Sequence, residues 1–419
     1  MKASPSVLVA LVALAGTGVL VRSQPARAAD GPAIELASPP EGASAWSRAC
    51  SFRHPACVHA APGTAPSFVL EALASVDRAW DTLTGALDVP PPAAGAGGVW
   101  DAYLVDGVEG GAETLPEARD PVGRVDRAAS FALLDRHTFP GCALDRAAAR
   151  AVARGSIWAE VPATDVGTGR AEAEMLARLA VVCPGDDDDW VFQSEPERTL
   201  VDPAWPAFDR GASTFFDWLD ATFGAAPGAL LVGTWALAAT ATPPAATRWS
   251  GAPTGFDVLG VSLKGALGTD SSLDDVFTAF AVQRGTAFPP VRLAWNIPWP
   301  AKARRFASPV PVAPTGASYV LVGVAGAPAR AKLRVEVAWE DFGRMRWSVV
   351  KLDAQGHAMA DVAVTSLRLG TSASITLEPL DGVDRVLVVG VDVGSTEHPF
   401  DPAQGWWEPH GWLLTVEGE

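Results

Sequence analysis

After residue 66, apolar positions recur every three or four residues along much of the chain, which is the spacing of amphipathic helices. In segment 67–87, Leu70, Leu73, Val76 and Trp80 fall on one such stripe. A longer block of the same character runs from residue 143 to about residue 284. It predicts helices over 143–160, 169–182, 209–223, 228–240, 256–267 and 272–283.

Beyond residue 291, apolar residues alternate with polar ones, as they do in half-buried strands. Turn residues such as Asp381 and Gly382 separate the runs, and no helical stretch lies between them. This pattern favours an antiparallel β-sandwich. The predicted strands cover 319–324, 333–339, 346–352, 363–369, 374–377, 385–393 and 412–416. Two earlier strands, 99–105 and 130–134, alternate poorly and are expected to be covered on both faces.

These patterns predict an α+β protein of several parts. Residues 29–66 are rich in Pro, Ala, Ser and Gly and form a loop-like lead segment. Residues 67–288 form an α-rich domain. Residues 289–419 form the β-sandwich domain, and a Pro-rich stretch around 288–314 marks the boundary.

The N-terminus, residues 1–28, is typical of a secretory signal peptide. Lys2 supplies the positive charge, residues 7–20 the apolar run, and Ala26 and Ala28 the small residues before a cleavage site ahead of Ala29. The alternative is an uncleaved anchor. We therefore expect a secreted or periplasmic protein.

The composition excludes several classes of function. The formal charge is −16, and it becomes −19 after residues 1–28 are removed, because that segment carries three basic residues and no acid. Nucleic-acid binding needs a basic surface, and none is visible. No later run is as long as the roughly 18 apolar residues of a membrane helix, so no membrane span is expected after cleavage.

The four cysteines predict two disulfides, because their number is even and the compartment is oxidising. We pair Cys50 with Cys57 and Cys142 with Cys183, although three connectivities are possible. The first pair has an alternative, since His54 and His59 complete a set of four possible metal ligands. Their spacing is not that of a standard zinc finger.

Motifs for catalysis or cofactor binding are absent. The chain has no H-E-x-x-H, no G-x-S-x-G and no phosphate-binding glycine loop. The acidic run 186–189 lacks the pattern of a calcium loop, so no cofactor is expected. Trp406 and Trp407 could stack on a ligand, but covering one end of the sandwich explains them as well.

The order of the parts, with segments such as 70–80 and 208–219, resembles exported bacterial zincin-like putative metallopeptidases of the gluzincin type. The resemblance covers roughly residues 65–419. It implies an α-rich zincin-like part followed by a C-terminal antiparallel β-sandwich. In this family, the first helix of a central pair carries H-E-x-x-H and the second carries a glutamate ligand.

This chain departs from the family at the metal site. Its first helix of the pair carries Arg146, Arg150 and Arg154 on one face, and a guanidinium is a donor that cannot bind zinc. Glu174 lies on the second helix, where the resemblance implies a glutamate ligand. The hypothesis is a salt-bridged degenerate site, with Arg146 and Arg150 facing Glu174 or its neighbour Glu172.

The sequence therefore favours an exported, non-catalytic protein that binds a peptide, protein or surface glycan. An active hydrolase with an unrecognised pair of carboxylates is one alternative. A structural envelope or adhesion protein is the other.

Overall fold

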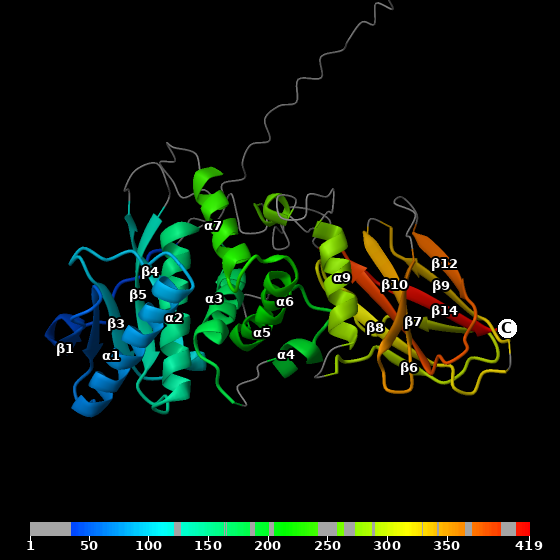
Figure 1. Ribbon diagram of the computed structural model, residues 1–419, viewed down its shortest axis with the longest axis horizontal. Coiled ribbons are helices and arrows are strands. Elements are labelled where there is room, and N and C mark those ends of the chain that lie inside the picture. Colours follow the sequence, from blue (N-terminus) through cyan, green and yellow to red (C-terminus); the bar gives the residue numbers. More distant parts are fainter. Residues whose placement is uncertain are drawn as a thin grey trace, which may run out of the picture.

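The protein is α+β, and its parts follow one another along a row (Figure 1). In this computed structural model a mixed sheet with two long helices lies at one end, shorter helices in the middle, and the β-sandwich at the other end. The predicted signal peptide, residues 1–28, and the residues Trp406 and Trp407 lie outside the described part of the chain. The structure describes residues 35–120, 127–162, 164, 166–184, 189–200, 205–241, 258–263, 273–286, 290–328, 330–341, 343–364, 371–394 and 408–419.

The N-terminal sheet has the order β1-β2-β3-β5-β4. Strands β2, β3 and β5 are parallel to one another, whereas β1 and β4 run antiparallel to them at the two edges. The expectation of a loop-like segment before residue 66 was wrong, because two strands form there. Short Ala- and Ser-containing strands have little pattern of their own, and pairing with β3 supplies their order. The strands are β1 (Ser47–Cys50), β2 (Ala56–Ala60), β3 (Trp100–Val105), β4 (Ala112–Asp120) and β5 (Arg127–Asp135).

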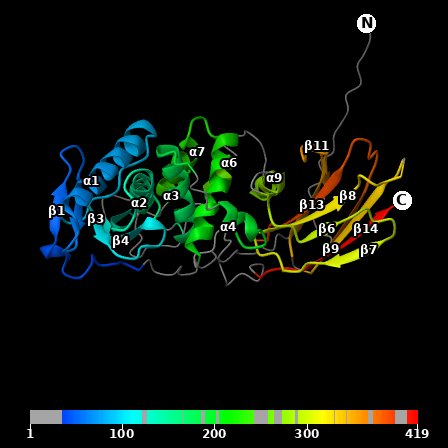
Figure 2. The same cartoon turned by 90° about the horizontal axis from the view of Figure 1, so that it is seen from below.

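Helices α1 (Pro66–Trp80) and α2 (Cys142–Glu160) cover one face of this sheet, and Figure 2 shows them together on that side. The predicted stripe 67–87 forms α1 and then a short π-helical segment, η2 (Asp81–Ala86). Helix α2 is buried over most of its length and is rich in alanine, so it can approach its neighbours closely. Its predicted range, 143–160, is confirmed within one residue.

The middle of the molecule is a group of shorter helices around an aromatic core. The predicted helix over 209–223 is divided at Ala212, where a tight turn separates α5 from α6. Phe215 stacks on Phe277 with their ring centroids 5.0 Å apart, and Phe192 and Phe208 lie beside them. The helices are α3 (Val166–Ala180), α4 (Asp189–Ser194), α5 (Pro206–Gly211), α6 (Ser213–Phe223), α7 (Ala229–Ala241) and α9 (Leu273–Thr286).

The C-terminal part is a sandwich of two sheets with the orders β11-β10-β13-β8-β6 and β12-β9-β14-β7. In β9, four buried apolar side chains face the core between the sheets and alternate with the exposed Arg334 and Glu336 and the half-buried Ala338. All pairs are antiparallel except β6 with β8. The short strands β6 and β7 were not predicted. The strands are β6 (Trp295–Ile297), β7 (Arg304–Ala307), β8 (Ala317–Gly323), β9 (Leu333–Trp339), β10 (Met345–Leu352), β11 (Ala358–Val364), β12 (Ser372–Leu377), β13 (Arg385–Asp392) and β14 (Trp412–Gly418).

Polar contacts tie the helices to the sandwich. The backbone N–H of Arg292, just before the sandwich strands, donates a hydrogen bond to the carbonyl of Gln193 in α4 at 2.9 Å. Tyr319 of β8 donates its hydroxyl hydrogen bond to the carbonyl of Ala281 at 3.0 Å. The two parts therefore share a well-packed boundary. No helix in the described ranges is both long and apolar enough to span a bilayer.

Candidate functional site

The two predicted disulfides are present. Cys50 and Cys57 face each other across the β1–β2 pair, and Cys142 at the start of α2 is bonded to Cys183, just beyond α3. The metal-binding alternative for the first pair is wrong, because both sulfurs are bonded to each other. The two histidines also point to different partners: His54 Nε2 lies 2.8 Å from Asp81 Oδ1, and His59 Nε2 lies 2.8 Å from Asp101 Oδ1.

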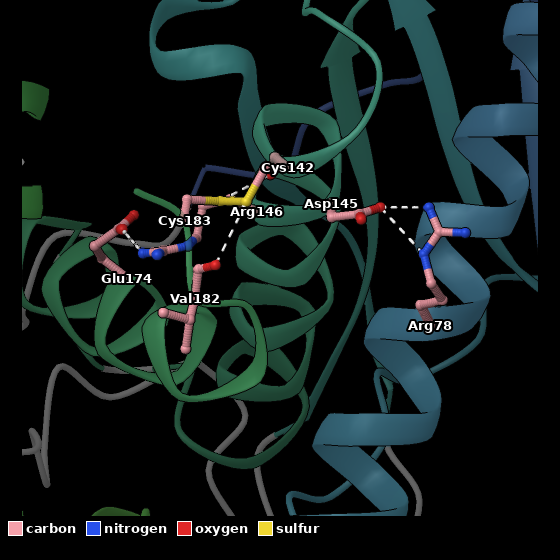
Figure 3. The surroundings of a disulfide bond; sticks show 7 residues. All are labelled: Arg78, Cys142, Asp145, Arg146, Glu174, Val182 and Cys183. Carbon is pink, nitrogen blue, oxygen red and sulfur yellow. Dashed lines mark hydrogen bonds and ion pairs between the residues drawn. A yellow bond between two sulfur atoms is a disulfide. The ribbon is translucent and has the colours of Figure 1, made fainter. Parts of the chain in front are cut away.

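The structure brings the predicted residues of the α2–α3 pair together. Arg146 Nη1 lies 2.9 Å from Glu174 Oε1, and Arg150 Nε lies 2.7 Å from Glu174 Oε2. Figure 3 shows Arg146 reaching from α2 to Glu174 on α3, beside the Cys142–Cys183 disulfide. The side chains of Arg146 and Glu174 are each 5% exposed. Both oxygens of one buried carboxylate are therefore held by guanidinium groups from the facing helix.

Arg178, one turn further along α3, also contacts Glu174. Its guanidinium lies 3.6 Å from Glu174 Oε1, 2.7 Å from Asp189 Oδ1 and 3.5 Å from Asp217 Oδ2. Burial raises the pKa of Asp217 to about 7, and the charges of Asp189 and Glu174 add to this, although Arg178 opposes it. We call Arg146, Arg150, Glu174, Arg178, Asp189 and Asp217 the arginine–carboxylate centre.

Arg154, the third arginine of the row, lies elsewhere. Its guanidinium packs 4.4 Å from the ring centre of Trp158. It also occupies the space beside Gly169 of α3, where an added Cβ would lie 1.3 Å from Arg154 Nη1. Glycine at this position therefore lets a buried arginine lie against α3. Glu172, the other acid considered, accepts a hydrogen bond from Trp235 Nε1 at 3.2 Å.

A second set of contacts joins the helices to the edge of the sheet. Arg170 of α3 lies 3.3 Å from Asp209 Oδ2 and 3.5 Å from Glu113 Oε2 of β4. Arg150 also donates to the carbonyl of Gly110 at 2.5 Å. Sequence reasoning missed Arg170, Asp209 and Asp217, because their partners are far apart in the chain. Arg178 could have been found, since it lies four residues after Glu174 on the same helix.

The centre has the chemistry of a structural ion network. Guanidinium groups only donate hydrogen bonds, and both oxygens of Glu174 face such donors. These residues do not fit the zinc ion that the resemblance implies. Within the described ranges, no group of three or more His, Cys, Asp or Glu is arranged to hold a metal. The arrangement can hold two helices in register, and we derive no reaction step from it.

A separate buried pair lies at the end of the sandwich. His410 Nδ1 is 2.7 Å from Asp392 Oδ2, and both side chains are buried. The hydrogen bond that His410 donates to the Asp392 carboxylate raises the pKa of His410. The carboxylate of Asp392 also accepts the backbone N–H of Gly394 at 2.7 Å. These hydrogen bonds hold the side chains of Asp392 and His410 in place at the end of the sandwich.

Comparison with known proteins does not assign this chain to a family. No family model and no curated protein matches the chain. Solved structures that resemble it do so weakly. The pre-peptidase C-terminal domain of collagenase from Bacillus anthracis is 11% identical, with a TM-score of 0.19, and the match covers 30% of this chain and 97% of that one. PliG from Aeromonas hydrophila, a periplasmic inhibitor of g-type lysozyme, is 10% identical, with a TM-score of 0.19 and coverages of 30% and 96%.

Proposed function

We propose that this chain is an exported, non-catalytic protein of zincin-like descent that binds a peptide, protein or glycan. The observation that carries the proposal is the contact of Glu174 with Arg146 and Arg150. The resemblance implies a metal between the two central helices. Guanidinium groups at that place neutralise the glutamate and leave no metal ligand beside it.

The hydrogen bonds of β4, at the edge of the N-terminal sheet, bear on how the chain would bind a peptide. An exposed edge strand can take up an extended peptide as a further strand. In β4, however, the carbonyl of Thr114 accepts a hydrogen bond from Trp158 Nε1 at 2.9 Å, and that of Pro116 accepts one from the N–H of Ala37 at 2.8 Å. Pro116 has no N–H to offer. These contacts favour recognition by side chains over strand addition at β4.

Export is supported by the two disulfides, which are typical of proteins in oxidising compartments. The experiment is a peptidase assay of residues 29–419 on denatured casein, with and without added zinc. We expect no cleavage above the level of a sample without the protein. Cleavage that rises with zinc and is abolished by a chelator would overturn the proposal. An Arg150→Ala protein serves as a control for a masked activity, and we expect it to be inactive too.

A further inference from the structure

Strand β12 is an edge of the sandwich whose outer side has no strand partner. It ends the sheet order β12-β9-β14-β7, so β9 is its only strand neighbour among the described residues (Figure 1). Its sequence, Ser-Ala-Ser-Ile-Thr-Leu, contains no charged residue and no proline. Such an edge offers unpaired N–H and C=O groups to another strand, and charged residues or proline are common ways to prevent this. Strand β12 is therefore open to pairing.

The pairing with β9 determines which backbone groups of β12 are free. The N–H of Trp339 donates a hydrogen bond to the carbonyl of Thr371, directly opposite, at 2.9 Å. Along an antiparallel strand, the backbone groups of successive residues point alternately toward and away from the neighbour. The N–H and C=O groups of Ser372, Ser374 and Thr376 therefore point away from β9. Their side chains are exposed as well.

The other edges of the sandwich are protected. Strand β6 has three residues and is followed at once by Pro298. In β7, the carbonyl of Ala307 accepts a hydrogen bond from the indole N–H of Trp295 at 2.8 Å. The pairing of β11 with β10 is irregular between Lys351 and Leu352. Short strands and bulges hinder edge-to-edge pairing, so within the sandwich only β12 has a regular free edge.

The side chains of β12 fit a second copy of the same strand. In an antiparallel pair with its two-fold axis at Ser374, Ser372 of one copy lies opposite Thr376 of the other. Ala373 then lies opposite Ile375 of the other copy, in a non-hydrogen-bonded pair, where side chains approach closely. Ala373 and Ile375 are half-buried and pack against the sandwich core. A small and a large apolar side chain thus meet on the core side, and hydroxyl groups meet on the exposed side.

The charged side chains near β12 are compatible with this pairing. On the neighbouring strand β9, Arg334 and Glu336 lie 3.7 Å apart and offset each other. At the end of β12, Lys332 lies 2.5 Å from Glu378. A foreign peptide that adds to a sheet edge is recognised through pockets for its side chains, and the exposed side chains of β12 are short hydroxyl groups. A second copy is therefore the occupant that this edge fits best.

We propose that β12 pairs with β12 of a second copy of this chain, antiparallel and with the two-fold axis at Ser374. Ser374 then exchanges its N–H and C=O hydrogen bonds with the same residue of the other copy, and the two four-stranded sheets become continuous. Because the pair is isologous and the other sandwich edges are protected, it closes as a dimer. One strand pair is smaller than the roughly 1,200–2,000 Å² interface of a stable complex, so the dimer is reversible. The pairing does not rest on the proposed function.

Sedimentation equilibrium of residues 29–419 tests the pairing, and we expect a monomer–dimer equilibrium. Ser374→Pro removes an N–H that points away from β9, where proline is tolerated in an edge strand. Because the dimer loses this hydrogen bond twice, its dissociation constant should rise about tenfold or more. Ser374→Ala keeps the N–H and is the matched control, which should dimerise nearly as the parent does.

Two further variants test the pairing without a proline. Ser374→Lys places two lysines opposite each other across the axis and should also weaken the dimer. Ser374→Cys should give a disulfide-linked dimer on mild oxidation, because the introduced thiols lie opposite each other. In Thr376→Cys the thiols lie on either side of the axis, beyond the Cα separation of about 7 Å that a disulfide can bridge, and the chains should stay unlinked. Unchanged melting temperatures show that the variants are folded.

Several results would overturn the pairing. A parent chain that stays monomeric up to its highest soluble concentration would do so, as would larger polymers in place of a dimer. A dimer that Ser374→Pro and Ser374→Lys leave as tight as Ser374→Ala would place the interface elsewhere. Equal cross-linking of Ser374→Cys and Thr376→Cys would contradict the axis at Ser374. None of these results bears on the casein assay, so the proposed function is tested separately.

Discussion

At the scale of single residues, Glu174 is the carboxylate that joins α2 to α3. It is 5% exposed and lies within 4 Å of three guanidinium groups. A buried ion pair adds little to stability compared with apolar packing, but breaking one leaves an uncompensated charge. The two arginines of α2 therefore depend on this one carboxylate.

We predict that Glu174→Gln lowers the free energy of unfolding by roughly 3–5 kcal/mol, because Arg146 and Arg150 lose their countercharge. Urea unfolding followed by circular dichroism measures this. Glu336→Gln removes an exposed acid that lies 3.7 Å from Arg334, and we expect a change of less than about 1 kcal/mol. Similar losses in both variants would show that the centre does not hold the helices.

The raised pKa of Asp217 predicts that the stability of the protein depends on pH. Its pKa is about 7 in the folded chain, against an ordinary value of 3.8, so the folded state holds the extra proton between these values. Stability then falls as pH rises from about 4 to about 7, because the charge on this half-buried carboxyl must form in the folded state. Asp217→Asn removes this penalty and should melt at a higher temperature than the parent at pH 8.

The control for this measurement is Asp381→Asn, at an exposed turn, which should follow the parent at every pH. Melting temperatures at pH 4, 6 and 8 give the comparison. At pH 4 the parent and Asp217→Asn should be nearly equal. If Asp217→Asn is less stable than the parent at pH 8, the ion pair with Arg178 outweighs burial, and the assigned direction is wrong.

At the scale of elements, the contact of α2 with α3 depends on a glycine. We predict that Gly169→Ala costs about 2–4 kcal/mol, because its Cβ would overlap the buried Arg154 guanidinium. Gly233→Ala in α7 is the matched control, since nothing lies within 4 Å of its added Cβ. There the better helix propensity of alanine should raise stability by up to about 1 kcal/mol. Equal effects would contradict the close packing at Gly169.

The lengths of the loops that the two disulfides close predict which disulfide contributes more to the free energy of unfolding. Cys142–Cys183 closes a separation of 41 residues, and Cys50–Cys57 one of seven. In the chain-entropy model these loops contribute about 4 and about 2.5 kcal/mol. The double variant Cys142→Ser/Cys183→Ser should therefore lose more stability in urea than Cys50→Ser/Cys57→Ser. The reverse order would mean that the hairpin β1–β2 depends on its disulfide more than α2 and α3 depend on theirs.

Elements differed in how far the sequence predicts them. Helix α2 and the strands β9 and β13 carry long periodic patterns, and their predicted bounds agree with the structure within a few residues. Strands β1, β2 and β4 have no such pattern, because their order comes from pairing with distant strands. Helical spacing placed the arginines on one face of α2, and the resemblance implied that Glu174 faces them; the structure brings Arg150 and Glu174 together. The contacts of Arg178 with Asp189 and Asp217 could not be predicted, since they depend on how α4 and α6 pack against α3.

At the scale of the whole molecule, the helices and the sandwich are joined by more than one connection. Arg344 and Arg346 of the sandwich both contact Asp274 of α9, at 2.8 and 3.3 Å. The loop before residue 200 pairs with the sandwich through backbone hydrogen bonds, such as that from Ala317 N–H to the carbonyl of Pro196 at 2.7 Å. Helix α4, which begins at Asp189 of the arginine–carboxylate centre, takes part in this boundary, because the Gln193 carbonyl accepts a hydrogen bond from the N–H of Arg292 at 2.9 Å.

We propose that arginine–carboxylate contacts stand at the place where the resemblance implies a metal. The zinc content of residues 29–419, purified without chelators and dialysed against zinc before a metal-free wash, distinguishes the two arrangements. We predict well under one zinc per chain and the same melting temperature with and without a chelator. One tightly held zinc per chain, with a melting temperature that falls when the chelator removes it, would mean that the two helices hold a metal after all.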